Sequence, residues 1–326
     1  DRTVSRGLGD VYKRQLEDLQ SAVYLSALLI VMVVIINTLL KWQRGSKSYA
    51  VKGSTDALKS TDRIDLKGNK LLLVWIIVGI PILFGLLLPL GQLFYWATLT
   101  YKKTFNIELL QIAGQSFTIA LVTTGLIILT SLALIYFSRW NHLKSLHFFK
   151  KVATIGYVIP GAIIGIGVIR SSQSFITFFD DLFSLEIGFI FYSSSVVLIY
   201  AYVFRFLAVV FHPLEANSLK VGKNISEASY LLNAGKIKTL FNIELPLLRT
   251  ALLTSGILVF IDVLKELPLT LILKPYNVQT LAVKAYEYAD DERVAQAALP
   301  ALMLIFTITI AIAFVSYLQK REKLNI

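Results

Sequence analysis

The chain has 326 residues, of which 56% are hydrophobic and only 16% are charged, and its mean hydropathy is +0.66. A soluble globular domain carries about a quarter charged residues, so this composition excludes an ordinary soluble protein. The net charge of +11 does not indicate nucleic-acid binding, because the basic residues gather in short segments between apolar blocks, where they set orientation in a membrane.

Seven apolar blocks follow one another along the chain, each long enough to cross a bilayer as a helix of about 20 residues. They lie at 21–40, 71–97, 110–137, 152–170, 187–211, 247–273 and 296–318. Strands of a membrane barrel would alternate apolar and polar residues instead. We therefore expect an all-α integral membrane protein with about seven transmembrane helices.

Charges in the connecting segments predict the side that each loop faces. The segments 41–70 and 138–151 and the tail after residue 318 are rich in lysine and arginine, which is typical of the cytoplasmic side. The segments 171–186 and 274–295 carry more acidic than basic residues and belong on the opposite side. All of these loops agree with a single topology.

The linker at 41–70 divides the chain into a short N-terminal part with one span and a long C-terminal part with six. Residues 1–15, DRTVSRGLGDVYKRQ, resemble a translated sequencing adapter, and we expect them not to be native. One span lies within 16–40, and residues 41–70 have the Gly, Ser, Lys and Asp content of a flexible cytoplasmic linker. Residues 71–326 then make a six-helix unit. A lone span before such a unit indicates the last span of a truncated first half.

Metal and thiol chemistry find no support in the sequence. The chain has no cysteine, which excludes disulfides and cysteine-based zinc sites. Its three histidines, His142, His147 and His212, lie in or beside predicted cytoplasmic loops. None has another His, Asp or Glu at a spacing that suggests a metal site, so we predict no metal site and solvated or interfacial histidines.

The longest cytoplasmic loop of the six-helix unit, about residues 212–246, has a regular pattern. Apolar residues recur at helical spacing over 218–232. The tripeptide Asn-Ala-Gly at 233–235 predicts a turn, since Asn and Gly tolerate a positive φ. A second amphipathic helix is predicted over 236–244, and Pro246 is expected to break it as the next span begins.

This helix–turn–helix segment over 218–246 is called the docking loop below. It is longer and more regular than a loop that only connects two spans needs to be. A rigid amphipathic protrusion indicates a partner with a matching groove. The alternative is a helix pair that lies on lipid headgroups, which its lysines would also suit. The pattern favours the partner and leaves both interpretations open.

The docking loop resembles the EAA motif of binding-protein-dependent ABC importer permeases, E-A-A-x3-G-x9-I-x-L-P. Five positions match this motif: Glu227, Ala228, Ile243, Leu245 and Pro246. Ser229 replaces the second alanine, and Asn233 occupies the glycine position, with a glycine two residues later at Gly235. Because Asn is the next-best residue for a left-handed turn, we expect the geometry of the turn to be kept.

This resemblance implies a type I, MetI-like helical bundle in a bacterial inner membrane. It also implies two cytoplasmic ATP-binding subunits, one of which would receive the docking loop, and a periplasmic or lipid-anchored substrate-binding protein. The chain has no G-x4-G-K-[ST] phosphate loop, so we expect a transport subunit that is not itself an enzyme. ATP and Mg²⁺ would be bound by the partner, and we expect no cofactor and no nucleic acid on this chain.

The span that follows the docking loop carries charged residues at helical spacing. Asp262, Lys265 and Glu266 can share one helix face, and Pro268 interrupts the helix just beyond them. Charged residues within a membrane usually face the bundle interior, a partner charge or water. Two interpretations stay open: an ion pair between Asp262 and Lys265 that fixes helix packing, or a lining of the transport pathway or its outer gate.

Two stretches bear on the substrate. The sequence KELPLTLILKPYNVQTLA at 265–282 and the linker string at 49–53 resemble the ferric-iron permease group of this superfamily, and the resemblance covers about residues 21–326. It implies import of Fe³⁺, with thiamine, sulfate and polyamine permeases as alternatives. From another class, an ion-coupled secondary transporter could use the charges at 262–266 as its coupling site. A scaffold protein without transport is a third alternative.

A glycine pattern predicts close helix packing in the fourth apolar block. Gly161 and Gly165 form a small-x3-small pair, with Gly167 beside them. Ordinary packing between membrane helices is favoured here over a pore-lining role.

Overall fold

The structure is a computed structural model that describes most of the predicted six-helix unit. It describes residues 67–140, 150, 153–183, 195–221 and 223–324, with scattered positions between 24 and 43. Within these ranges the ordered elements are all helices, with no strand. The predictions for residues 1–15, for most of the first span and the linker, and for His142 and His147 lie outside the described residues.

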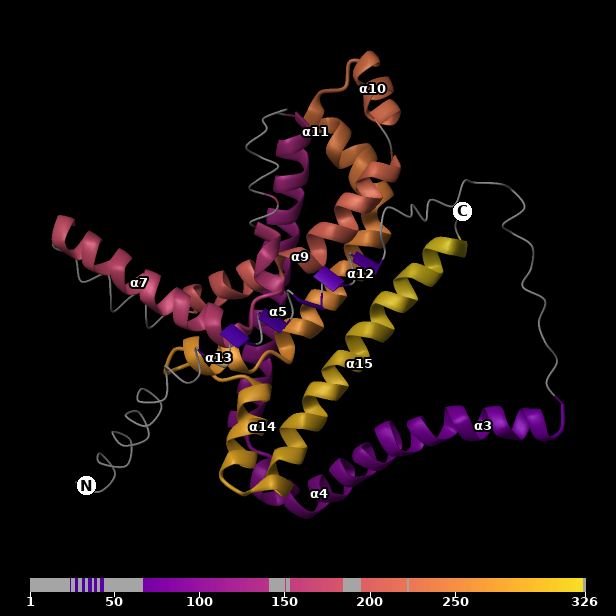
Figure 1. Cartoon of the computed structure of the whole chain (residues 1–326), viewed down its shortest axis with the longest axis vertical. Coiled ribbons are helices and arrows are strands. Elements are labelled where there is room, and N and C mark those ends of the chain that lie inside the picture. Colours follow the sequence, from indigo (N-terminus) through magenta and orange to yellow (C-terminus); the bar gives the residue numbers. More distant parts are fainter. Residues whose placement is uncertain are drawn as a thin grey trace.

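Three long helices form the centre of the bundle. They are α5 (Ile107–Trp140), α9 (Val196–Val221) and α12 (Leu245–Leu264), which pack against one another (Figure 1). Their facing sides share one apolar core, in which Ile127 and Val259 are fully buried. Because lipid is as apolar as these side chains, close packing and not exclusion from water holds such helices together.

The first helical run, predicted as block 71–97, has a π turn in its middle. The run consists of α3 (Asn69–Ile82), the π turn Leu83–Leu87 and α4 (Leu88–Thr104). Pro81 and Pro89 flank the turn, and a π turn is one of the local adjustments that accommodates proline within a helix. Figure 1 shows α3 projecting from the packed centre, and its side chains are exposed over most of its length.

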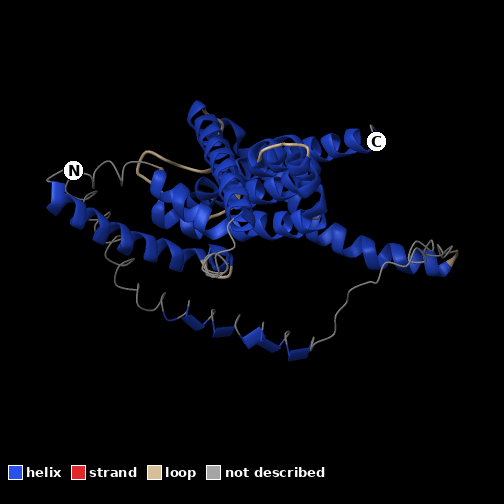
Figure 2. Ribbon diagram, turned by 90° about the horizontal axis from the view of Figure 1, so that it is seen from above, coloured by secondary structure: helices blue, strands red, loops and turns tan. Residues whose placement is uncertain are grey.

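The C-terminal part of the chain packs against α4, the second helix of the first run. A short helix, α14 (Leu281–Asp290), is followed by α15 (Val294–Leu324), which covers the predicted block 296–318 and packs against α14 and α4. Viewed from above, the central helices overlap in one compact cluster from which other helices project (Figure 2).

The predicted span 152–170 differs from the structure. Helix α7 (Gly161–Phe183) begins after Pro160 and continues through residues that we expected in the external loop 171–186. Only Gly161–Ser172 is strongly apolar, and this is shorter than a membrane span requires. The reason is local, because proline favours a helix start and the second half of α7 holds no glycine or proline that would end it.

Five helices among the described residues are long and apolar enough to cross a membrane. They are Leu71–Thr104, Ile107–Trp140, Val196–Leu219, Lys236–Leu264 and Val294–Arg321. These helices correspond to five of the seven predicted blocks, and the predicted all-helical membrane class is confirmed.

Candidate functional site

The docking loop forms one end of the bundle, beside the C-terminal end of α5 (Figure 1). It consists of α10 (Lys223–Leu231), a turn, α11 (Lys236–Thr239) and the π turn Leu240–Glu244, which runs directly into α12. Helix, turn and second helix therefore occur in the predicted order. The first helix is shorter than expected, because residues 218–221 continue α9.

Asn233 takes the left-handed conformation that the motif assigns to glycine. Its φ is 61°, and the backbone around it forms a Schellman turn. The amide of Asn233 donates to the carbonyl of Tyr230 at 3.0 Å, and the amide of Ala234 donates to that of Ser229 at 3.1 Å. Gly235 is extended, with φ −67° and ψ 159°, and needs no glycine geometry. The prediction for Asn233 is confirmed.

Ser229 links the two helices of the docking loop. Its hydroxyl lies 2.9 Å from the hydroxyl of Thr239 on α11, and both side chains are buried. Thr239 also donates to the carbonyl of Gly235 at 3.1 Å. The serine at the second alanine position is therefore small enough to pack between the helices and also adds a hydrogen bond that alanine could not make.

Pro246 does not break the helix, contrary to our prediction. Residues 236–264 form one continuous helical run in which the π turn Leu240–Glu244 lies just before the proline. Proline cannot donate the usual bond to the residue four positions earlier, and its ring crowds that carbonyl. The wider π turn accommodates the proline, so the second helix of the docking loop is a direct extension of α12.

The outer surface of the docking loop exposes large apolar side chains. Leu231 is 88% exposed and Leu232 84%, and on the second helix Ile237 is 67% and Phe241 61% exposed. The motif residues Glu227, Ala228 and Pro246 are also exposed, whereas Ile243 and Leu245 are half-buried. A protrusion with this much apolar surface is typical of a contact site for a protein or a membrane surface.

The predicted charge cluster lies at a break in the next helix. Helix α12 ends at Leu264, and α13 (Pro268–Leu273) begins after three residues, 265–267, that belong to neither helix. Lys265 pairs with Asp262 at 2.8 Å, as one of the two interpretations predicted, but 60% of the lysine side chain is exposed. This pair is therefore local to the end of α12 and does not join two helices.

Glu266 points in the other direction and pairs with Arg205 of α9. The carboxylate lies 3.5 Å from Nε of Arg205, and both side chains are largely buried. Glu266 also accepts a bond from the amide of Leu269 at 3.2 Å, which caps α13, and Arg205 donates to the carbonyl of Ile159 at 3.3 Å. One buried ion pair thus connects three segments. The three charged residues do not act together on one helix face as predicted, because Asp262 pairs with Lys265 and Glu266 pairs with Arg205.

Sequence reasoning missed Arg205. The signal was present, because Arg205 is the single charged residue inside the apolar block 187–211, and an ionisable residue at such a position needs a partner. Its partner could not be chosen from the sequence, since Asp262 and Glu266 are equally plausible by type and only the three-dimensional arrangement distinguishes them.

The glycines of α7 make room for this arrangement. A Cβ at Gly161 would lie 2.5 Å from Nη1 of Arg205 and 2.7 Å from the Glu266 carboxylate, and a Cβ at Gly165 would lie 2.9 Å from Ile272 of α13. Gly167 has nothing within 4 Å. The predicted close packing is confirmed for the first two glycines, which allow α7 to approach the ion pair and α13.

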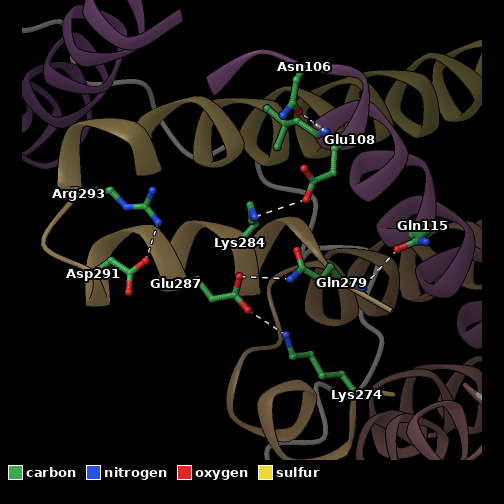
Figure 3. A network of polar contacts seen from close by, with 10 residues as sticks. Asn106, Glu108, Gln115, Lys274, Gln279, Lys284, Glu287, Asp291 and Arg293 are labelled. Atoms are coloured by element: carbon green, nitrogen blue, oxygen red, sulfur yellow. Dashed lines mark hydrogen bonds and ion pairs between the residues drawn. The ribbon is translucent and has the colours of Figure 1, made fainter. Parts of the chain in front are cut away.

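A polar network holds the opposite end of the bundle, where α14 meets the start of α5 (Figure 3). The amide of Leu281 donates to the buried Ser116 hydroxyl of α5 at 2.8 Å. Lys274 pairs with Glu287 at 2.9 Å, and Lys284 approaches Glu108 at 3.7 Å. Both ends of α5 therefore make polar contacts with neighbouring segments. Within the described part of the chain, no cluster of three or more His, Asp or Glu residues could hold a metal ion.

Comparison with known proteins places these features in a family. Residues 147–324, more than half of the chain, match the model of the family described as binding-protein-dependent transport system inner membrane component. The matched region includes the docking loop, the helix break and the Glu266–Arg205 pair.

Two curated relatives carry names that mention iron. The chain is 26% identical over 235 residues to the ferric transport system permease protein FbpB of Actinobacillus pleuropneumoniae, covering 67% of this chain and 34% of the relative. It is 24% identical over 222 residues to the Fe(3+)-transport system permease protein FbpB 2 of Haemophilus influenzae, covering 67% of this chain and 41% of the relative. The chain thus spans less than half the length of these relatives.

The fold also has a solved counterpart. A crystal structure of a bacterial ABC transporter involved in the import of the acidic polysaccharide alginate superposes with a TM-score of 0.55 at 11% sequence identity. The superposition covers 77% of this chain and 94% of that chain. At this identity the similarity concerns the helical architecture alone.

Proposed function

The chain belongs to the family of binding-protein-dependent transport system inner membrane components, and on this basis we propose that it is the permease subunit of an ATP-driven importer of ferric iron. In this proposal it spans a bacterial inner membrane several times. Two ATP-binding subunits act on the cytoplasmic side, and a periplasmic or lipid-anchored binding protein delivers the substrate from outside.

The observation that carries the proposal is the geometry of the docking loop. The Schellman turn at Asn233 and the Ser229–Thr239 hydrogen bond make it rigid, and its exposed leucines offer an apolar contact surface. A helix presented in this way fits a groove on a partner protein. ATP and Mg²⁺ would be bound by that partner, which supplies the energy.

The path from the docking loop into the membrane is continuous helix. Because the π turn joins the loop to α12 without a break, a displacement of the loop moves α12 as a rod of about 30 Å, at about 1.5 Å per residue. The rod ends at the break before α13, where the direction of the chain changes. Closure of the ATP-binding subunits would in this way change the arrangement of helices around the transport pathway.

The assignment of ferric iron is supported by the stretch at 265–282 and by the names of the two relatives. Permeases for thiamine, sulfate or polyamines remain the alternatives within the class. An ion-coupled transporter is disfavoured by the charges at 262–266, because Asp262 and Glu266 already have cationic partners within the chain.

The test is uptake of radiolabelled Fe³⁺ by vesicles that contain the full-length protein with its ATP-binding and binding-protein partners. We expect uptake that requires ATP and that is lost in Glu227→Lys, which reverses an exposed charge on the docking loop. The matched control is Asp290→Lys, which reverses the charge of an exposed acid at the C-terminal end of α14, away from the docking loop. This variant should retain uptake.

Two outcomes would contradict the proposal in different ways. Uptake that follows an ion gradient and ignores ATP would refute the importer. ATP-driven uptake of another solute, with no iron above the level of empty vesicles, would refute the substrate and leave the importer in place.

A further inference from the structure

Glu244 is a buried carboxylate that the motif leaves unspecified. It is the last residue of the π turn, lies in the variable position of I-x-L-P, and is only 4% exposed. A buried carboxylate is costly unless its charge is paired and its oxygens are hydrogen-bonded. The residues around Glu244 therefore indicate what it is placed to do.

The two oxygens of Glu244 contact two different elements. The Ser226 hydroxyl of α10 donates to Oε1, and Nη1 of Arg139, near the C-terminal end of α5, lies 3.6 Å from Oε2. Ser226 directly precedes the motif residue Glu227. One side chain thus connects both helical parts of the docking loop to a helix that lies more than a hundred residues earlier in the sequence.

Apolar packing does not make this connection by itself. A pocket of about 470 Å³ lies between the docking loop and α5, and it is lined by Arg139, Glu244 and Tyr230 among others. One further contact crosses from loop to helix, where Nζ of Lys236 lies 5.9 Å from the ring centre of Trp140. Leu240 of the loop also packs against the apolar core, and because the interface is partly open, the charged contacts contribute to holding the loop against α5.

Helix α5 connects the Glu244–Arg139 contact to the other end of the bundle. The helix packs against α9 and α12, and at its other end Ser116 accepts the bond from the Leu281 amide that holds α14. Arg139 and Ser116 are 23 residues apart, so about 35 Å of helix separates the docking-loop contact from the hydrogen bond between Ser116 and Leu281. Rigid helices and polar contacts of this kind can carry coupling between distant sites.

We propose that Glu244 is a positioning residue that passes movement of the docking loop to α5 through Arg139, and from α5 to the α14 end of the bundle. This inference rests on the proposed function, because it assumes that an ATP-binding subunit moves the loop. In its absence the loop would still pull on α12, to which it is covalently joined, while α5 and α14 would follow only through the packing of α5 against α12 and α9.

The experiment compares Glu244→Gln, Arg139→Gln and the double variant in the full-length protein assembled with its partners. Glutamine keeps the shape and the hydrogen bond to Ser226 but removes the charge. We expect the ATP-binding subunit to co-purify in wild-type amounts and ATP turnover to stay within about twofold. The number of substrate molecules imported per ATP should fall at least about fivefold. The double variant should match the single ones, because residues that act through each other are not additive.

Glu215→Gln is the matched control. The Glu215 carboxylate pairs with Lys150 at 2.8 Å at the same end of the bundle, and its contact with the docking loop, a bond from the Ser218 hydroxyl to the Glu215 carbonyl, is made by the backbone and survives the change. Import per ATP should therefore stay unchanged. Glu244→Asp, which keeps the charge, should recover part of the coupling.

The outcomes separate this inference from the function on which it rests. If Glu244→Gln lowers assembly, ATP turnover and import in parallel, so that import per ATP is unchanged, the role of Glu244 is only structural and the inference is wrong. Effects of the single variants that add up in the double variant would also overturn it. Failure of the wild-type protein to bind an ATP-binding subunit would overturn the proposed function and the inference together.

Discussion

Replacement of Glu266 by alanine should destabilise the bundle strongly, because the change leaves a buried guanidinium without its counter-charge. Arg205 is only 19% exposed, its Nε lies 3.5 Å from the Glu266 carboxylate as an ion pair, and its Nη1 donates a hydrogen bond to the Ile159 carbonyl. Breaking a buried ion pair from one side costs about 3–5 kcal/mol. The loss of the helix cap at Leu269 adds about 1 kcal/mol.

Residual exposure of Arg205 lets water reach part of the group, so the lower end of the ion-pair range applies, about 3 kcal/mol. With the lost contact to the Leu269 amide the expected total is about 4 kcal/mol. The assay measures the free energy of unfolding of the purified protein in detergent by titration with denaturant. Lys265→Ala serves as the control at the neighbouring position. It removes an exposed pair, and we expect a cost of at most about 1 kcal/mol.

The double variant Arg205→Met/Glu266→Met refines the test. Because apolar replacement of a whole buried pair is often neutral or stabilising, it should recover most of the stability that Glu266→Ala loses. The reasoning would be refuted if Glu266→Ala cost no more than Lys265→Ala, or if the double variant were less stable than the single one.

Three further predictions concern local geometry. Asn233→Val should cost about 1–2 kcal/mol of stability, because a β-branched residue resists a φ of 61°, whereas Asn233→Gly should be tolerated; thermal unfolding compares the two. Gly161→Leu should prevent α7 from packing and lower the yield of folded protein, while Gly167→Leu, with open space around it, should not; equal yields would contradict this. Ser116→Ala should leave the Leu281 amide unpaired at a cost of about 1–3 kcal/mol, seen as faster hydrogen exchange at the start of α14.

The docking loop shows how far local sequence can reach. The turn at Asn233 was predictable because a left-handed residue at a helix end depends on the residue itself and on its own backbone neighbours. The effect of Pro246 was predicted wrongly, because proline does end helices when nothing else compensates. Here the preceding π turn compensates, and its last residue, Glu244, faces Arg139, a contact over more than a hundred residues.

The charge cluster at 262–266 shows what could not be predicted from the sequence. The sequence correctly indicated that Asp262, Lys265 and Glu266 lie at the end of a helix interrupted before Pro268. It could not indicate that Glu266 turns toward Arg205, because helical spacing specifies which residues share a face but not which helix packs against that face.

The sequence by itself therefore determined the membrane class, most of the helices, and the docking turn. These follow from composition, the length of apolar blocks and residues that act on their own backbone. Only the tertiary structure decided the partners of the buried charges, the use of Gly161 as space for an ion pair, and the link from Glu244 to α5. The physical reason is that a buried charge is satisfied by whichever group the packing brings within a few ångströms, and that group lies far away in the chain.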